Sequence, residues 1–152
     1  MTIGELCIRD TFIVQQDDTV VEAAKLMRVF NVGDLIVVDP GKEGNMPLGI
    51  VTDRDIVLNI VADNTDPQTV TVGEIMSKEL VTGREEDGVY ESMERMRVHG
   101  IRRLPVVDGQ GYLSGILSVD DLLEFLGEEV TSLIGLIYKE QHLRGSGVDE
   151  KV

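Results

Sequence analysis

The sequence is poor in aromatic residues, has no tryptophan and contains a single cysteine. Aromatic residues make up 4% of its 152 residues, so a core drawn from the 42% hydrophobic fraction must be largely aliphatic. Cys7 has no second cysteine for an internal disulfide, and no His/Cys cluster accompanies it. This usage is typical of a reducing compartment and argues against structural zinc. We therefore expect a cytoplasmic protein with no metal site.

Long apolar runs and an excess of basic residues are missing too. No run approaches the length of a bilayer crossing, and no signal peptide is present, so we expect no membrane partner. Fourteen basic residues face 28 acidic ones, which gives a net charge of −14. This charge disfavours nucleic acid as a partner. An anion-binding site would depend on locally clustered arginines.

No catalytic constellation is visible either. The chain has no Cys/His or Ser/His/Asp set in a motif context, no Walker loop and no metal-ligand spacing. The isolated His99 and His142 favour surface or packing roles. We expect a protein that is not an enzyme and has no catalytic residue.

An internal duplication organises the chain. Thr2-Ile3-Gly4-Glu5-Leu6 reappears as Thr71-Val72-Gly73-Glu74-Ile75, an offset of 69 residues (71 − 2). Further residues match at the same offset: Asp18 with Asp87, Glu22 with Glu91, Met27 with Met96, Leu35 with Leu104, and Val37-Val38-Asp39 with Val106-Val107-Asp108. The first copy then has extra turn-forming residues between Pro40 and Pro47, which widen a hairpin loop. One copy is too small to bury its apolar face well, so two copies should pack together.

Both copies predict the order β-α-β-β-α. The apolar spacing of Val20, Ala23, Ala24 and Met27 indicates a helix with a buried face. The elements expected in the first and second copies are strands at 11–14 and 80–82, helices at 20–29 and 89–98, strands at 35–38 and 104–107, strands at 48–51 and 113–117, and helices from about Asp55 and Asp121.

Two polar corners carry the functional hypothesis. Thr52 and Asp55, and likewise Ser118 and Asp121, place a hydroxyl and a carboxylate three residues apart where a strand passes into a helix. Free N–H groups at a helix start suit a phosphate or a polyol. The same spacing resembles a capping box, which only starts a helix. Capping does not exclude ligand binding, and both interpretations stay open.

The chain resembles a pair of CBS repeats, the module named after cystathionine β-synthase. The motifs that carry the resemblance are Val72-Gly73-Glu74-Ile75-Met76-Ser77, Arg103-Leu104-Pro105-Val106-Val107-Asp108, Gly49-Ile50-Val51-Thr52-Asp53-Arg54-Asp55 and Gly115-Ile116-Leu117-Ser118. The resemblance implies an α/β fold of two repeats, residues 1–68 and 69–127, packed with pseudo-two-fold symmetry. Residues 128–152 would form a C-terminal helical extension and flexible tail.

The resemblance implies two clefts that bind adenosine-containing ligands. Asp55 and Asp121 would hold the ribose, because a carboxylate accepts from both hydroxyls. Thr52 and Ser118 would donate to a phosphate. Adenine contacts would fall within residues 8–13, 35–37, 78–81 and 104–106, with Ile36, Val37, Pro105 and Val106 as site residues. Phosphate charge would be met by Arg102, Arg103 and Arg54. The first repeat has Gly33 and Asp34 at the positions that match Arg102 and Arg103, so we expect unequal clefts.

The segment after the second repeat carries an apolar stripe. Its members are Leu122, Leu123, Leu126, Val130, Leu133, Ile134 and Ile137, with Gly127 and Gly135 as points where a helix could break. We expect disorder from Arg144 to Lys151. The stripe and the resemblance together predict a homodimer built mainly from helices of both repeats, with the segment from Leu122 to Ile137 adding contact. Packing of the segment onto its own chain is the alternative.

The function expected is that of a stand-alone regulatory module for energy sensing. It would bind AMP, ADP, ATP or S-adenosylmethionine as a regulatory ligand, have no obligatory cofactor, and signal to a separate target protein that the sequence does not identify. The alternative is a structural adaptor with empty clefts that acts through protein–protein contacts.

Overall fold

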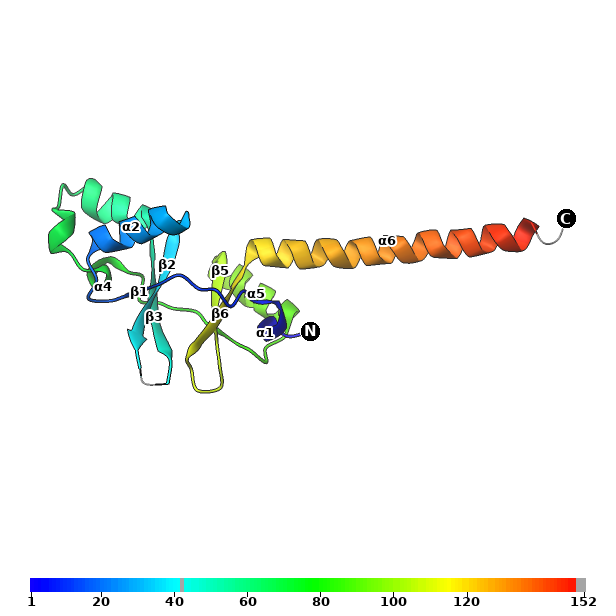
Figure 1. The fold of residues 1–152 in the computed structure, drawn as a ribbon, viewed down its shortest axis with the longest axis horizontal. Coiled ribbons are helices and arrows are strands. Elements are labelled where there is room, and N and C mark those ends of the chain that lie inside the picture. Colours follow the sequence, from blue (N-terminus) through cyan, green and yellow to red (C-terminus); the bar gives the residue numbers. More distant parts are fainter. Residues whose placement is uncertain (42, 150–152) are drawn as a thin grey trace. The chain divides into compact units, whose positions relative to one another are not determined.

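A computed structural model describes residues 1–41 and 43–149 (Figure 1). The chain divides into two compact units, Met1–Leu117 and Ser118–Val152, and each is described by itself. Both copies of the duplication show the predicted β-α-β-β-α order. The elements up to the unit boundary are α1 (Ile3–Leu6), β1 (Ile13–Gln15), α2 (Val20–Phe30), β2 (Asp34–Pro40), β3 (Asn45–Thr52), α3 (Asp53–Ile56), the π-helix η1 (Val57–Val61), the 3-10 helix η2 (Pro67–Thr69), α4 (Val72–Ile75), β4 (Gly83–Arg84), α5 (Val89–His99), β5 (Arg103–Val107) and β6 (Leu113–Ser118).

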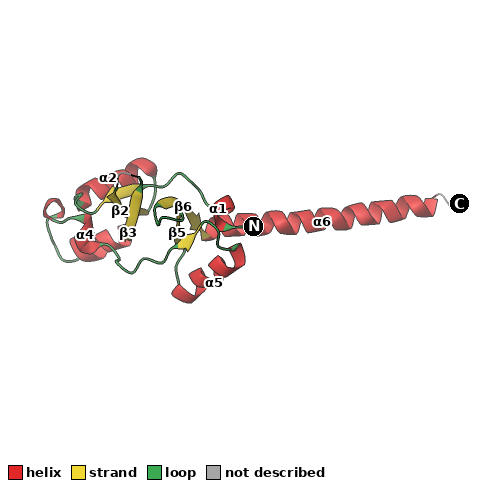
Figure 2. Cartoon of the chain, turned by 90° about the horizontal axis from the view of Figure 1, so that it is seen from below, coloured by secondary structure: helices red, strands yellow, loops and turns green. Residues whose placement is uncertain are grey.

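Each copy builds one three-stranded mixed sheet, in the orders β1-β2-β3 and β4-β5-β6 (strands in yellow in Figure 2). β1 runs parallel to β2 with Val14 opposite Val37. β4 runs parallel to β5 with Gly83 opposite Val106, which is the same register shifted by the 69-residue offset. β2 and β3 are antiparallel, with a register shift between Val37 and Val38. The duplication in the sequence is therefore a duplication of backbone pairing.

The segment that leads each copy, residues 2–8 in the first and 71–77 in the second, packs against the other copy, so the two copies exchange their leading segments. The backbone of Ile8 pairs with Ile116 on β6, whereas the matching Ser77 pairs with Ile50 on β3. The short helices follow the same rule, since α1 contacts β4 and α4 contacts β1. Each copy thus supplies the segment that completes the other.

Close backbone approach at these crossings requires glycine. A Cβ atom on Gly49 would lie 2.3 Å from the carbonyl oxygen of Ser77. A Cβ atom on Gly115 would lie 2.6 Å from Sγ of Cys7 and 2.9 Å from the carbonyl oxygen of Ile8. Contacts this short are sterically forbidden, so the matching glycines admit the exchanged segments.

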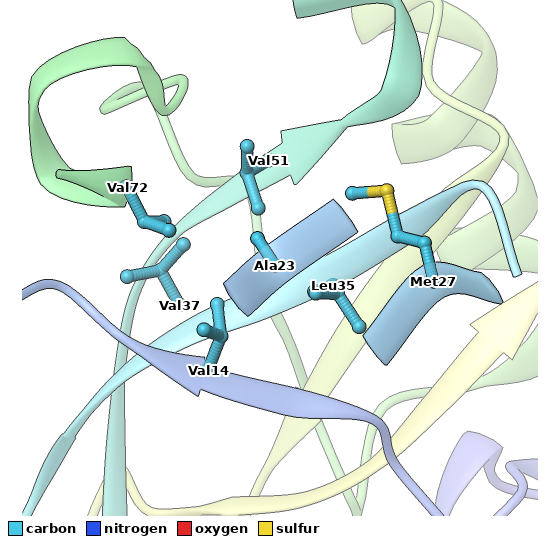
Figure 3. Close-up of a cluster of buried hydrophobic side chains, with 7 residues drawn as sticks. All are labelled: Val14, Ala23, Met27, Leu35, Val37, Val51 and Val72. Atoms are coloured by element: carbon cyan, nitrogen blue, oxygen red, sulfur yellow. The ribbon is translucent and has the colours of Figure 1, made fainter. Parts of the chain in front are cut away.

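The core of the first copy is aliphatic, as the composition predicts. One cluster of seven buried side chains draws on β1, α2, β2, β3 and the exchanged α4 (Figure 3): Val14, Ala23, Met27, Leu35, Val37, Val51 and Val72. α2 places Ala23 and Met27 one turn apart toward the sheet, as the helical spacing predicts. Val72 is fully buried, which shows that the leading segment of the second copy is part of the core of the first.

The second unit contains one helix, α6, from Val119 to Asp149. The helix runs through Gly127 and Gly135, where the sequence allowed for a break. It also continues through Arg144 to Asp149, where disorder was expected; residues 150–152 lie outside the described residues. Many of its apolar side chains are exposed, among them Leu123, Val130, Leu133, Ile134, Leu136 and Ile137. No described helix is both long enough and apolar enough to cross a bilayer.

Candidate functional site

The Thr52–Asp55 corner closes on itself through two reciprocal hydrogen bonds. The N–H of Asp55 donates to Oγ1 of Thr52 at 3.1 Å, and the N–H of Thr52 donates to Oδ2 of Asp55 at 2.9 Å. The capping-box interpretation is therefore confirmed, and α3 begins at Asp53, two residues earlier than expected. The cap uses Oδ2 alone, and within the described residues Oδ1 of Asp55 accepts no hydrogen bond. This carboxylate therefore keeps an oxygen with which to accept from a ligand.

Ser118 and Asp121 form the same cap at the start of the second unit. The N–H of Ser118 donates to Oδ2 of Asp121 at 2.8 Å, and the N–H of Asp121 donates to Oγ of Ser118 at 3.1 Å. The Ser118 hydroxyl also donates to Oδ2 at 2.7 Å. α6 accordingly begins at Val119, ahead of the expected Asp121.

A cleft of about 240 Å³ opens beside the Thr52–Asp55 corner within the first unit. Its walls combine apolar and polar side chains: Ile50, Thr52, Asp55, Ser77, Glu79, Leu80, Val81, Ile101 and Arg103. The corner comes from the first copy, whereas residues 77–103 of this wall come from the second. The exchanged leading segment explains the meeting, because the pairing of Ser77 with Ile50 brings Glu79, Leu80 and Val81 to the corner.

Arg103 is the cationic side chain among the described residues that line this cleft, and it is paired with an acid. Its Nη1 lies 2.5 Å from Oδ2 of Asp34, the residue that matches Arg103 in the first copy. The Asp34 side chain is 19% exposed and the Arg103 side chain 41%. Asp34 stands opposite Thr52 in the pairing of β2 with β3, so the sheet fixes it beside the corner. The sequence predicted the charge difference at this position but not the contact.

Several residues expected in the site lie elsewhere. Arg102 and Arg54 are exposed and do not line the cleft. The adenine candidates are buried side chains of β2 and β5, so they have contacts with the protein core: Ile36 at 3%, Val37 and Val106 at 0%, and Pro105 below 2% exposure. Any ligand contact from these strands would come from their backbone groups. Ser118 and Asp121 belong to the second unit, where they cap the start of α6.

The sequence analysis missed three lining residues, Ile50, Ser77 and Ile101. Ile50 precedes the buried Val51, so strand alternation turns it to the opposite face of β3. Ser77 matches Ile8 by the 69-residue offset, and residues 8–13 were expected near a ligand. The duplication therefore contained the signal for Ser77. Within the described part of the chain, no group of three or more His, Cys, Asp or Glu could hold a metal ion.

A second hollow of about 350 Å³ lies between α2 and the η1–η2 region. Its lining is mainly apolar: Val20, Val21, Ala24, Lys25, Arg28, Ile56, Ile60, Val61 and Pro67. Among the described residues that line it there is no carboxylate, the group that would accept from the two hydroxyls of a ribose.

Comparison with known proteins identifies relatives that match most of the chain. An uncharacterised protein of Methanopyrus kandleri is 36% identical over 124 residues, which cover 82% of this chain and 62% of that protein. The CBS domain-containing protein YhcV of Bacillus subtilis is 41% identical over 120 residues, covering 76% of this chain and 81% of YhcV. Inosine-5′-monophosphate dehydrogenase of Methanocaldococcus jannaschii is 33% identical, but the match covers only 22% of that enzyme. The similarity to this enzyme is therefore confined to a small part of it.

Solved structures share the fold. The CBS domain pair of protein MJ0100, solved in complex with 5′-methylthioadenosine and S-adenosyl-L-methionine, has a TM-score of 0.71 at 26% identity; the match covers 85% of this chain and 98% of that one. The CBS domain protein PAE2072 of Pyrobaculum aerophilum, complexed with AMP, has a TM-score of 0.68 at 30% identity and covers 80% and 90%. The CBS domain family itself matches residues 3–62 and 72–128. The chain is therefore a member of the CBS-domain family and contains two CBS domains in tandem.

Proposed function

We propose that this CBS pair is a regulatory module that binds an adenosine-containing ligand in the cleft beside Thr52 and Asp55 and signals to a separate protein. One observation carries the proposal: the cleft joins an apolar wall to a carboxylate with an unused oxygen. Ile50, Leu80, Val81 and Ile101 offer the apolar surface that an adenine ring needs. Oδ1 of Asp55 is placed to accept from ribose hydroxyls while Oδ2 keeps the cap.

The solved CBS pairs support this class of ligand. One was solved with two adenosyl compounds and another with AMP. In the proposed complex, the ligand contacts the first copy at the corner and the second copy at residues 77–81 and 101–103. A ligand so placed would change the free energy of the contact between the copies, which is how binding becomes a signal.

Calorimetry tests the proposal on protein that has been unfolded, washed free of carried-over ligand and refolded. The panel contains AMP, ADP, ATP, adenosine, 5′-methylthioadenosine and S-adenosylmethionine, with guanosine as the non-adenosyl control. Asp55→Asn keeps an oxygen for the cap and removes the second acceptor. We expect it to weaken binding by about tenfold, the size of one lost hydrogen bond to a charged group.

Asp63→Asn is the matched control, because Asp63 is exposed and has no part in the cleft. The control should bind like the wild type. Absence of binding by every adenosyl compound would refute the proposed function. Asp121→Asn, titrated in the same way, tests whether the Ser118–Asp121 corner also takes part, through the stoichiometry of binding.

The same proposal includes self-association through α6. Leu123, Leu126, Val130, Leu133 and Ile137 follow a spacing of three and four residues, with β-branched residues at 130 and 137 and leucines at 126 and 133. This pattern is typical of two-stranded coiled coils. Leu123, Val130, Leu133 and Ile137 are each more than half exposed. A second copy of α6 would remove this apolar area from water.

Light scattering coupled to gel filtration measures the mass of the assembly. We expect a dimer that Leu133→Glu with Ile137→Glu converts to a monomer. Thr131→Glu with Ser132→Glu is the control, since it adds the same charge outside the apolar stripe. A monomeric wild type across micromolar concentrations would refute the dimer.

A further inference from the structure

We infer that the cleft selects adenosyl ligands that carry no net negative charge, and that Asp34 is the residue that sets this selectivity. The inference rests on the proposed function and specifies the ligand class for the same site. It starts from the geometry of one ion pair and from the charges that surround it.

The ion pair neutralises Arg103, the cation of the cleft, with the carboxylate of Asp34. Nη1 of Arg103 lies 2.5 Å from Oδ2 of Asp34, within charge-assisted hydrogen-bond distance. A ligand phosphate must either displace Asp34 or bind an arginine whose charge is already neutralised. Displacement is opposed by the backbone, because Asp34 begins β2 and is paired in the sheet with Thr52 of the corner itself. Asp34 would therefore stay near any phosphate that reached Arg103.

The other charged side chains that line the cleft are negative. Asp55 and Glu79 line it and add two carboxylates to that of Asp34, against the one guanidinium of Arg103. A fourth carboxylate lies close by, since Oδ2 of Asp53 is 3.1 Å from where a Cβ of Gly33 would stand, next to Asp34 in the chain. Like charges disfavour one another more strongly where the protein lowers the local dielectric. A phosphate that carries close to two negative charges at neutral pH meets this excess directly.

The carboxylates do not repel a neutral ligand, and they attract a cationic one. The ribose of 5′-methylthioadenosine needs only the acceptor of Asp55, and its thioether brings no charge. The sulfonium of S-adenosylmethionine is attracted by the same carboxylates that repel a phosphate. The cleft thus distinguishes ligands by what replaces the phosphate at the 5′ position, while adenine and ribose are common to all of them.

The duplication explains why a single residue, Asp34, sets the selectivity of the cleft for uncharged or cationic ligands. Positions 34 and 103 are the same position in the two copies, occupied by an acid in one and a base in the other. The two side chains meet each other, so changing Asp34 alters the charge at Arg103 without changing the cleft wall, to which Asp34 does not belong. Asp34→Asn keeps the size of the side chain and removes one negative charge.

The experiment titrates ligand-free protein with 5′-methylthioadenosine, S-adenosylmethionine and AMP at low salt. We expect the wild type to bind 5′-methylthioadenosine and S-adenosylmethionine at least about tenfold more tightly than AMP. Asp34→Asn should raise the affinity for AMP about tenfold and leave that for 5′-methylthioadenosine unchanged, because an isolated charge contact is worth about this factor. Asp39→Asn is the matched control, since it removes the same charge from the exposed far end of β2.

A second variant tests the inference in the opposite direction. Arg103→Gln leaves Asp34 unpaired, so it should weaken AMP binding further and strengthen binding of S-adenosylmethionine. Thermal melting of both variants shows that they fold. AMP that binds the wild type as tightly as 5′-methylthioadenosine, or an AMP affinity that Asp34→Asn does not change, would overturn the inference and leave the proposed function intact. Failure of all three compounds to bind would overturn the inference, and failure of the whole adenosyl panel would also refute the proposed function.

Discussion

The two CBS copies agree where the backbone must turn and differ where side chains fill space or carry charge. Asn31 and Gly100, which match by the offset, both end a helix in the left-handed conformation, at φ of 54° and 62°. Gln15 and Arg84 each donate their N–H to the matching acids Asp18 and Asp87. The capping boxes that start α1 and α4 are also alike.

Four of the matched positions that differ change a helix cap, a buried group or a charge. They are Thr19 and Gly88, Ala23 and Ser92, Leu26 and Arg95, and Asp34 and Arg103. None of them alters the order or pairing of the elements that both copies share. The duplicated fold therefore keeps its helix ends and its crossings. Matched positions with different side chains are the places where one copy differs from the other in stability or charge. For a substitution in one copy, the matched residue of the other copy provides the control.

The largest effect is expected at the glycines of the two crossings. Gly49→Ala places a Cβ against the rigid carbonyl of Ser77 at 2.3 Å, and Gly115→Ala places one against the Cys7 side chain at 2.6 Å. Overpacking of this kind costs about 3 kcal/mol or more where backbone must move. We expect Gly49→Ala to lower the free energy of unfolding more than Gly115→Ala, as measured by urea denaturation.

Gly109→Ala is the control for this pair, because nothing lies within 4 Å of its added Cβ. It should change the free energy of unfolding by no more than a few tenths of a kcal/mol. Equal and small losses at Gly49 and Gly115 would mean that the exchanged segments can shift away, and that the crossings are loose.

The second effect concerns Asp87, which has a partner that Asp18 lacks. The N–H of Arg84 lowers the pKa of Asp87, and the Arg95 guanidinium, 2.8 Å away, lowers it further. Hydrogen bonds to charged groups contribute about 1.5–3 kcal/mol. We expect Asp87→Ala to reduce the free energy of unfolding by about 2 kcal/mol and Asp18→Ala by about half as much, since residue 26, which matches Arg95, is a leucine.

The pH dependence of this loss follows from the direction of the pKa shift. A carboxylate with a lowered pKa in the folded protein stabilises it fully above the unfolded pKa, about 4, and this contribution is lost as pH falls through the lower folded value. The difference between wild type and Asp87→Ala should therefore be full at pH 7 and shrink below about pH 4. A difference that stays constant down to pH 2.5 would contradict the role of the Asp87 charge.

The helices of both copies lie where the sequence predicts them, whereas one strand does not. Helical spacing predicted residues 20–29 and 89–98, and the helices are Val20–Phe30 and Val89–His99. The strand expected at residues 80–82 was wrong in place: β4 is Gly83–Arg84, and Leu80 and Val81 line the cleft. A two-residue strand has no periodicity to detect. Gly127 and Gly135 do not break α6, because a cost of about 1 kcal/mol for each is too small.

The corner was predictable from its own spacing, whereas Arg103 and residues 79–81 of the opposite wall were expected only from the resemblance to CBS pairs. Thr52 and Asp55 are adjacent in one turn, so their spacing alone indicates that they meet. Ser77 reaches the cleft through its pairing with Ile50, and no local pattern encodes that pairing. The adenine candidates Ile36 and Val106 have buried side chains, so a ligand contact at these positions stays a prediction for their backbone groups.

The third effect compares Ala23 with Ser92, which occupy the same place on α2 and α5. Both are completely buried, and within the described residues Oγ of Ser92 has no hydrogen-bond partner. A buried unpaired hydroxyl costs about 1 kcal/mol or more. We expect Ser92→Ala to raise the free energy of unfolding by about 1 kcal/mol and Ala23→Ser to lower it by a similar amount. Differential scanning calorimetry measures both; destabilisation by Ser92→Ala would show that the hydroxyl is satisfied in solution.

The smallest effect concerns the N-cap residues of the same two helices, Thr19 and Gly88. Thr19 accepts from the N–H of Glu22 at 3.2 Å, and the Glu22 carboxylate accepts from the N–H of Thr19 at 3.0 Å. Gly88 has nearly the same backbone angles, φ −71° and ψ 150°, but no side chain to cap α5. Nothing lies within 4 Å of a Cβ at Gly88, and Glu91 stands three residues later, where a capping box needs it. The second copy thus lacks only the hydroxyl.

Exchanging these two residues tests whether the copies obey the same local rules. We expect Gly88→Thr to raise the free energy of unfolding by about 0.5 kcal/mol and Thr19→Gly to lower it by about the same amount. The two sites share no hydrogen bond or ion pair, so their effects should add and the double exchange should unfold at the urea concentration of the wild type. A double variant that is clearly less stable would mean that α2 depends on its cap more than α5 does, although both helices begin beside the other copy's leading segment, through the pairings of Thr19 with Thr71 and of Gly88 with Thr2.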